Sequence, residues 1–264
     1  MSGQDLGTMR EQELDVRLSQ DVYLVGGGST RAFGLSFDPD CHIYVIDGGS
    51  ELALVDCGMG DPQSLERIVK NIQDEGLDID RLSTLILTHY HVDHAGGAAR
   101  FRERLGLKTI APRGAAQALR MGDERAVSLD EAKRAGLYPA DYSVEPVEVD
   151  QEVAEGDVLH IGDVHLEVFD TPGHCAGHAS YLLSGRERRY LLAGDAVFHG
   201  GTIVLQNIHD CSIQESASSA RKLADLEFDA LLPGHANITL TNGRSHAEMA
   251  AATFEQLYVP KNLF

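Results

Sequence analysis

Residues 84–94 read TLILTHYHVDH, an apolar, strand-like run that passes directly into three histidines and an aspartate. Imidazole nitrogens and carboxylate oxygens are the ligands that zinc and similar cations prefer in proteins. A helix would separate His89 from His91 by about 200° around its axis, so the two can face one point only on extended or loop backbone. The preceding strand supplies that backbone. The segment therefore predicts a metal site at a strand end, with a spacing that permits two ions.

Three later segments repeat this arrangement, because each runs from an apolar stretch into a turn with glycine and ends on a ligand-type residue. They are DTPGH at residues 170–174, LAGD at 192–195 and LLPGH at 231–235. Glycine allows close backbone approach and unusual dihedral angles, so the next side chain can face a buried ion. The four turns are expected to converge on one rim. The candidate metal ligands are His89, His91, Asp93, His94, His174, Asp195 and His235.

With these segments the sequence resembles the metallo-β-lactamase superfamily, whose His-x-His-x-Asp-His signature is present at residues 89–94. The resemblance implies an α/β fold of the αββα four-layer sandwich type. It also implies two divalent metal ions, of which Zn²⁺ is the first expectation and Fe or Mn the alternatives, since such ligand sets bind several metals. One ion would be bound by His89, His91 and His174, the other by Asp93, His94 and His235, and Asp195 would bridge them.

Two further residues are expected behind the ligands. The resemblance suggests Asp56, in the segment LVDCG at residues 54–58, as a carboxylate that orients a ligand histidine. A metal-bound imidazole needs an acceptor for its other N–H group, which supports that role. His178 follows the candidate ligand His174 by four residues, and it either supports the ligands or packs as a structural histidine.

The aspartate at position 195 separates branches of the superfamily. True β-lactamases usually lack a bridging carboxylate there, whereas glyoxalase II, lactonases and tRNA-processing nucleases carry one. Acyl-homoserine lactonases usually have a tyrosine three residues later, where this chain has Phe198, and the Gly-Arg-Thr-Asp segment typical of glyoxalase II is absent. Phe198, His199 and His209 are candidate substrate contacts, with an ordinary surface position as the alternative for the two histidines.

A hydrolase is the function that this ligand set predicts first. Two cations that share a water can lower its pKa from about 15.7 toward about 7, so a metal-bridging hydroxide would attack a carbonyl carbon. Asp93 could orient the water or shuttle a proton, and it is a predicted catalytic residue together with Asp195. The expected substrate is a small-molecule lactone or thioester. The alternative is an iron-dependent oxidoreductase, of the persulfide dioxygenase or diiron type, and a phosphodiesterase is less favoured.

The composition narrows the classes of molecule that the chain is expected to bind. The chain has 264 residues, and 22 Lys+Arg against 41 Asp+Glu give a formal net charge of −19, which disfavours nucleic acid and anionic membranes. No run approaches the roughly 18 apolar residues that span a bilayer, and the four cysteines form no Cys-x-x-Cys pair. We therefore expect a cytoplasmic protein that acts on a small molecule. A homodimer is an open alternative, because the first 20 residues could pack on a neighbouring subunit.

The length fits one compact metallo-β-lactamase-type domain at residues 21–264, after an N-terminal extension at residues 1–20. Apolar runs predict strands near residues 22–25, 42–46, 52–55, 84–87, 165–169, 190–193 and 229–232. Periodicity predicts helices over residues 62–75, 114–121, 212–226 and 244–257. The least periodic stretch, residues 122–143, is interpreted either as a lid beside the site or as an ordinary surface excursion.

Overall fold

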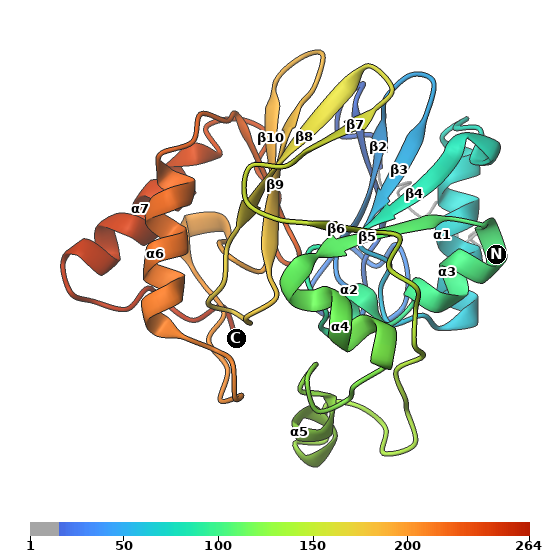
Figure 1. Ribbon diagram of the computed structural model, residues 1–264. Helices are drawn as coiled ribbons and strands as arrows, with labels where there is room; N and C mark the ends of the chain where they lie inside the picture. The colour runs from blue at the N-terminus through green and yellow to red at the C-terminus, as the bar shows by residue number, and fades with distance from the viewer. Residues whose placement is uncertain (1–15) are drawn as a thin grey trace, which may run out of the picture.

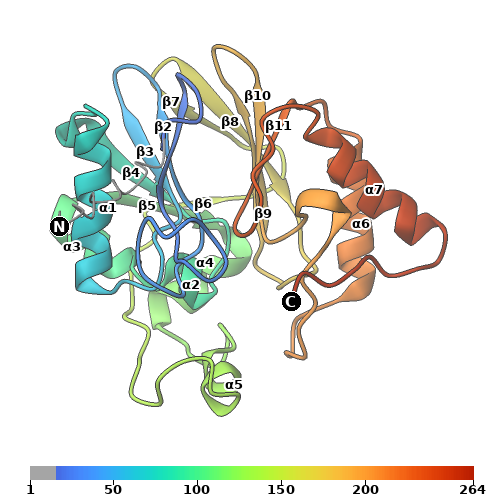
Figure 2. The same cartoon turned by 180° about the vertical axis from the view of Figure 1, so that it is seen from behind.

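The computed structural model describes residues 16–264, in which two β-sheets pack face to face between outer helices (Figure 1). Helices α1 (Pro62–Asp74) and α3 (Ala98–Leu105) cover one sheet. Helices α6 (Ile213–Ala224) and α7 (Arg244–Glu255) cover the other, and both views show the same layers (Figure 2). The predicted αββα sandwich is confirmed.

The first sheet has six strands in the order β1-β2-β3-β4-β5-β6. Its strands are β1 (Val22–Gly26), β2 (Ile43–Asp47), β3 (Leu52–Val55), β4 (Leu82–Ile86), β5 (Lys108–Pro112) and β6 (Gln151–Val153). The pairs β1–β2 and β2–β3 are antiparallel, whereas β3 to β6 run parallel. Parallel strands bring their carboxyl ends to one edge of the sheet, and this is the edge from which the HYHVDH segment leaves β4.

The second sheet has five strands in the order β11-β10-β9-β8-β7. They are β7 (Val158–Ile161), β8 (Val164–Asp170), β9 (Ala179–Ser184), β10 (Arg189–Gly194) and β11 (Ala230–Pro233). β10 and β11 are parallel, and the other neighbours are antiparallel. Strands β8, β10 and β11 each end one or a few residues before a candidate ligand.

The helices form where the sequence supplies caps and an apolar face. Asp61 accepts hydrogen bonds from the backbone N–H groups of Gln63 and Ser64. Pro62 follows in the first turn, where the fixed φ angle of proline matches that of a helix, so α1 begins at Pro62. The remaining helical elements are α2 (Val92–Ala95), α4 (Arg113–Met121), α5 (Leu129–Arg134) and the 3₁₀ helices η1 (Ile79–Arg81) and η2 (His199–Gly201). Within residues 16–264, no helix combines the length and the apolar character needed to cross a membrane.

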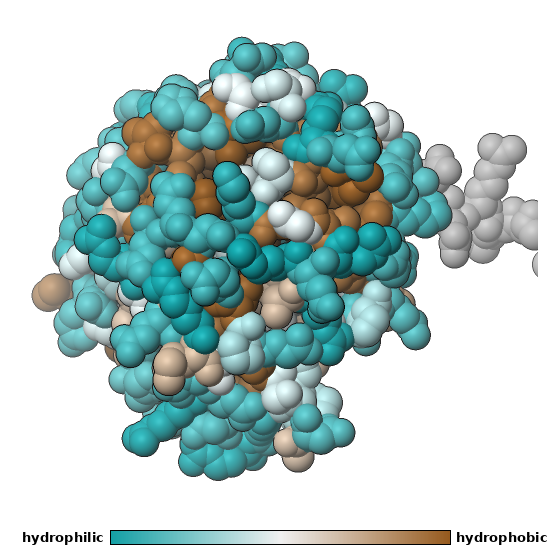
Figure 3. All heavy atoms as spheres, turned by 45° about the vertical axis from the view of Figure 1, so that its right-hand side comes forward, coloured by the Kyte–Doolittle hydropathy of each residue, from teal (hydrophilic) through white to brown (hydrophobic). Residues whose placement is uncertain are grey.

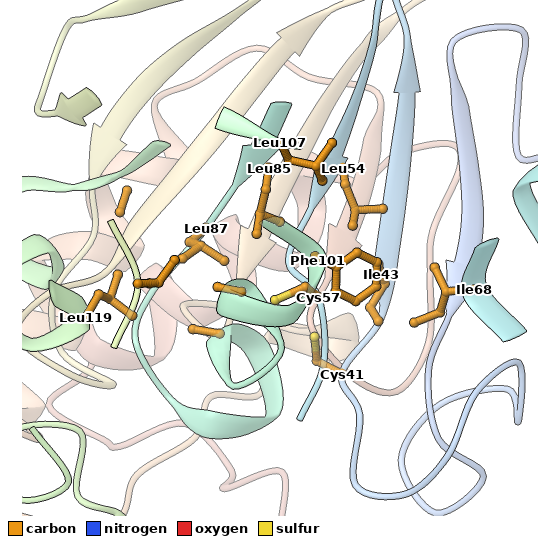
Figure 4. Close-up of a cluster of buried hydrophobic side chains, with 14 of the residues drawn as sticks. Cys41, Ile43, Leu54, Cys57, Ile68, Leu85, Leu87, Phe101, Leu107 and Leu119 are labelled. Atoms are coloured by element: carbon orange, nitrogen blue, oxygen red, sulfur yellow. The ribbon is translucent and has the colours of Figure 1, made fainter. Parts of the chain in front are cut away.

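Alternation along the strands divides the core into layers. Leu54 faces the outer helices, whereas its neighbour Val55 faces the second sheet. Figure 4 shows Leu54 and Ile43 near Phe101 of α3, and all three side chains are fully buried. Each such side chain contributes about 1.5–3 kcal/mol through burial, so the sheets and helices form a rigid support for the loops at their edge.

Polar residues cover most of the face shown in Figure 3, with apolar side chains in the recesses between them. This distribution agrees with the acidic composition. The division into an extension at residues 1–20 and a domain at 21–264 stays a prediction, because residues 1–15 lie outside the described residues. Val16, the first described residue, is buried, and its carbonyl oxygen accepts a hydrogen bond from the backbone of Leu24 in β1.

Candidate metal centre

Four loops carry the predicted ligands, and each leaves the carboxyl end of a strand. The loops follow β4, β8, β10 and β11, and they meet at the edge that the two sheets share. Close backbone approach requires glycine at position 234, because a Cβ there would lie 2.3 Å from the Asp195 carboxylate and 2.6 Å from the His94 ring. The glycine that precedes His235 therefore lets this loop approach the others.

One group of donors contains His89, His174 and Asp195, whose ligand atoms lie within 4.8 Å of one another. His91 lies beside them, with its Nδ1 2.8 Å from Nε2 of His174. The Asp195 Oδ2 atom is 3.6 Å from the same His174 nitrogen. These four side chains come from three loops that are distant in sequence.

A second group contains Asp93, His94 and His235. The two imidazole Nε2 atoms are 3.3 Å apart, and Asp93 Oδ2 is 3.2 Å from that of His235. Asp195 also faces this group, because its Oδ1 is 3.4 Å from His94 Nε2 and its Oδ2 is 3.6 Å from His235 Nε2. The structure thus brings all seven predicted ligands together and puts Asp195 between the two groups.

The donor atoms fit metal ions. Two nitrogens bound to one tetrahedral zinc at about 2.0–2.1 Å would be separated by about 3.3 Å, close to the spacings found here. Within residues 16–264, His89 Nε2 and Asp195 Oδ1 are buried atoms without a hydrogen-bond partner. Buried polar atoms are rarely left unpaired, so a cation between these donors would satisfy both.

Hydrogen bonds behind the donors fix how the rings face the centre. The Asp56 carboxylate is 2.8 Å from His94 Nδ1, and it also accepts from the backbone N–H and the hydroxyl of Thr88. The Thr88 oxygen in turn lies 3.0 Å from His89 Nδ1. With a proton on its Nδ1, the His89 ring points its Nε2 lone pair toward the donor groups, and the contact with Asp56 turns Nε2 of His94 the same way.

His178 supports Asp195 from behind. Its Nε2 accepts a hydrogen bond of 3.0 Å from the backbone N–H of Asp195, while its Nδ1 lies 2.8 Å from the Thr171 hydroxyl. Gly194 makes room for this ring, since a Cβ there would lie 2.6 Å from His178 Nε2. The position matches the supporting role that was expected as one of two alternatives.

The electrostatics also favour cations. Burial, followed by repulsion from neighbouring imidazoles, holds the pKa of His89 well below its ordinary value and lowers that of His91 to about 3, so both rings are neutral donors near pH 7. Burial opposes a charged His94, but the surrounding thiol and carboxylates outweigh it and raise the pKa of His94 well above its usual range. Burial likewise opposes an ionised Asp195, yet the facing histidines hold its pKa well below normal. Positive charge between the two donor groups therefore stabilises the ionised carboxylates of the site.

A cleft of about 780 Å³ opens onto this centre, and His91 and Asp93 form part of its lining. Further parts of the wall come from residues in the loops at 30–40 and 206–208. The remaining wall comes from residues 127–138, which include α5 and belong to the segment predicted as a lid or excursion. This segment lies beside the site, as the first of those alternatives requires.

The three residues predicted as substrate contacts do not lie together at the cleft. Phe198 is fully buried, and His199 is exposed with its ring 4.4 Å from that of His246 in α7, so the structure does not bring these two to the cleft. The chain turns away after Asp195 and packs η2 against α7. His209 lies beside the cleft wall, where its Nδ1 is 3.2 Å from the hydroxyl of the lining residue Ser128.

Two residues of the cleft lining, Arg31 and Tyr138, were not predicted from the sequence. Tyr138 is half-buried, and within residues 16–264 its hydroxyl makes no hydrogen bond. Burial first, and then the charge of Asp93, raise its pKa well above the usual value, so the hydroxyl is a protonated donor at neutral pH. Neither residue lies in a recognisable motif, and no local signal in the sequence indicates it.

Comparisons with known proteins agree with this geometry. The family model described as the metallo-beta-lactamase superfamily matches residues 38–235. The chain is 29% identical to the acyl-coenzyme A thioesterase MBLAC2 of Gallus gallus over 213 residues, which cover 75% of this chain and 73% of that protein. It is 31% identical to a hydroxyacylglutathione hydrolase of Mesorhizobium japonicum over 61% of this chain and 51% of that protein. It is 28% identical to the atrochrysone carboxyl ACP thioesterase of Aspergillus fumigatus over 84% and 58%.

Solved structures share the fold. BJP-1, a subclass B3 metallo-beta-lactamase of Bradyrhizobium japonicum, superposes with a TM-score of 0.67 at 23% identity, over 91% of this chain and 90% of that one. A metallo-beta-lactamase family protein from Thermus thermophilus gives a TM-score of 0.69 at 24% identity, over 91% and 81%. At these identities the likeness concerns the fold alone.

Proposed function

The chain belongs to the metallo-β-lactamase superfamily of metal-dependent hydrolases, and from this premise we propose that it hydrolyses small-molecule thioesters with two divalent metal ions. The observation that carries the proposal is Asp195, whose carboxylate lies between two groups of candidate ligands. His91 and Asp93 of these groups line a cleft. Two of the similar proteins are named as thioesterases, and the hydroxyacylglutathione in the name of a third is itself a thioester.

The lining of the cleft supports a thioester more than an ester or lactone. Among the described lining residues there is no lysine, and the histidine present, His91, is a candidate ligand. A thiolate leaves with a pKa near about 8.5 and needs no proton from the protein, whereas an alkoxide leaving group, with a pKa closer to water's roughly 15.7, benefits from a general acid. The cleft therefore suits a leaving group that departs as an anion.

Each part of the site has a distinct task in this reaction. Metal ions bound by the two donor groups would polarise the carbonyl and lower the pKa of water. Asp195 keeps the two groups together, and His178 holds its backbone in position. Asp93 is the candidate ligand with a carboxylate that also lines the cleft, so it is placed to accept a hydrogen bond from the attacking water and orient it.

Chelation tests the metal requirement through stability as well as activity. Removing metal is expected to abolish thioester hydrolysis and to lower the Tm by about 10 °C, because a ligand at about a thousand times its Kd stabilises the folded state by about 4 kcal/mol. Added zinc should restore both. The measurement combines elemental analysis of protein purified without chelator, thermal unfolding, and assays with a thioester, a lactone and a phosphodiester of matched size. Bound iron with oxygen uptake and no hydrolysis, or full activity without metal, would contradict the proposal.

Tyr138→Phe tests the cleft wall. The free hydroxyl of Tyr138 is available to donate a hydrogen bond to the carbonyl oxygen as negative charge grows on it, so its loss is expected to lower kcat by about 10²-fold while KM changes less. The matched control is Tyr142→Phe, because the Tyr142 hydroxyl donates to the backbone oxygen of Met59 instead. That variant should keep kcat within about twofold and lose about 1 kcal/mol of stability. Equal kcat in the wild type and Tyr138→Phe would remove this role.

A further inference from the structure

Arg31 occupies an unusual position at the edge of the metal centre. Its backbone oxygen accepts a 2.7 Å hydrogen bond from Ala236, the residue after the candidate ligand His235. Its guanidinium carbon lies 3.6 Å from the centre of the Phe264 ring, and that ring meets the His235 ring edge-on with centroids 5.9 Å apart. Arg31 is thus held beside the centre both by its backbone and by the face of its guanidinium group.

The segment that carries Phe264 is itself fixed. The C-terminal residues run back from α7 toward the edge of the sheets where the candidate ligands lie (Figure 1). Backbone hydrogen bonds join Ile203 to Lys261 and Leu263, and the Asn262 side chain bonds the backbone of Leu205 in both directions. The Phe264 ring that stacks on Arg31 is therefore held in a defined position.

The charge of Arg31 has no carboxylate partner within residues 16–264. The other arginine of the cleft, Arg134, lies 3.3 Å from Asp130 and 3.8 Å from Glu131, so its charge is balanced. The nearest acid in the same loop is also engaged, since Asp38 accepts from Ser29 and Thr30. Arg31 forms no such ion pair, although it lines a cleft that contains several carboxylates.

The stacking contact leaves the N–H groups of the Arg31 guanidinium available to a ligand. The guanidinium carbon lies 3.6 Å from the centre of the Phe264 ring, a separation at which an N–H group aimed at the ring would collide with it. The contact therefore uses the face of the planar group and leaves the N–H donors, which lie in the plane, at its edge. This in-plane fork matches the two oxygens of a carboxylate or phosphate. In a chain of net charge −19, an anionic substrate would need such a dedicated cation near the reacting centre.

We propose that Arg31 binds an anionic group of the thioester substrate, a carboxylate or phosphate, and makes this enzyme selective for anionic thioesters. The inference rests on the proposed thioesterase function and adds the substrate class. The anion can belong to the acyl group or to the thiol carrier, because the same guanidinium chemistry recognises both.

The test uses three thioesters that differ in where charge lies: acetyl-N-acetylcysteamine, which is neutral, succinyl-N-acetylcysteamine, with a carboxylate on the acyl side, and acetyl-coenzyme A, with phosphates on the thiol side. In Arg31→Met, which keeps an apolar stem on Phe264, KM for the anionic substrate is expected to rise about 10–100-fold with little change in kcat. KM for the neutral thioester should stay within about twofold. Which anionic substrate responds identifies the side.

The matched control is Arg134→Met, because Arg134 lines the same cleft but is already paired. It should leave all three KM values within about twofold. Equal KM changes for neutral and anionic substrates in Arg31→Met, or none, would overturn the inference while leaving the thioesterase proposal intact.

A binding measurement separates the two proposals. Non-hydrolysable thioether analogues of the two anionic substrates are compared by calorimetry, and at least one should bind the metal-loaded wild type about 10–100-fold more tightly than Arg31→Met. If the wild type hydrolyses none of the three thioesters but this difference persists, the proposed reaction fails and the anion site stands. If the analogues bind both proteins equally, Arg31 has no role in recognition.

Discussion

Asp195→Ala is expected to reduce the bound metal from the two ions of the proposed mechanism to about one or fewer per chain and to lower kcat/KM by about 10³-fold. Asp195 faces both donor groups, at 3.4 Å from His94 and 3.6 Å from both His174 and His235. Its two oxygens thus reach histidines of each group. The loss of this carboxylate removes several kcal/mol of metal binding and charge stabilisation, and each 1.36 kcal/mol corresponds to a factor of about ten in rate.

The variant should fold, because Asp195 is held through its backbone N–H by His178, and this bond does not need the carboxylate. Asp195→Asn keeps the shape and one neutral oxygen, so an intermediate loss is expected from it. Asp163→Ala is the control, since the Asp163 side chain is 76% exposed on a hairpin between strands of the second sheet. Elemental analysis and thioester kinetics on the three variants test whether Asp195 is needed for metal binding and activity. Two metals and full activity in Asp195→Ala would show that this aspartate bridges nothing.

The candidate ligands could be predicted because their signals are local. Each lies where an apolar run passes into a short turn, and the residue types alone indicate metal chemistry. The strands that lead into them, β4, β8, β10 and β11, were predicted for the same reason. Residues that build the cleft are different, since long-range packing decides their place. Tyr138 lies after the six-residue helix α5, in a stretch without periodicity, and it lines the cleft only because that stretch folds beside the loops that carry His91 and Asp93.

Proximity in sequence to a candidate ligand did not predict proximity to the cleft where the chain changes direction. His199 follows Asp195 by four residues, and this proximity suggested substrate contact. Gly200 and Gly201 adopt positive φ angles there, and a Cβ on Gly201 would lie 2.7 Å from Met249 of α7. The turn therefore packs against the helix instead of the cleft. Strand β6 was missed for a related reason: its three residues gain their structure from pairing with β5, which no local pattern reveals.

Asp56→Asn is expected to weaken metal binding about 10–100-fold and to lower kcat/KM in proportion. Asp56 is 2% exposed and accepts from His94 and from two groups of Thr88. Its φ of 58° is a left-handed conformation that asparagine tolerates, so the backbone should not change. An amide cannot accept at both ends. Either His94 loses its acceptor, or its proton moves to Nε2, where it would face the metal position.

The control must separate this orientation effect from general loss of stability. Asp40→Asn suits that purpose, because Asp40 is also 2% exposed and accepts hydrogen bonds from Ser36, Ser64 and the backbone of Met59, but none from a histidine. Both variants should lose about 1–3 kcal/mol of unfolding free energy in chelated protein, as measured by urea denaturation. Metal affinity, from competition with a chromogenic chelator, should fall only in Asp56→Asn. An equal fall in both variants would mean that Asp56 acts through stability, and that the orientation of His94 does not depend on its charge.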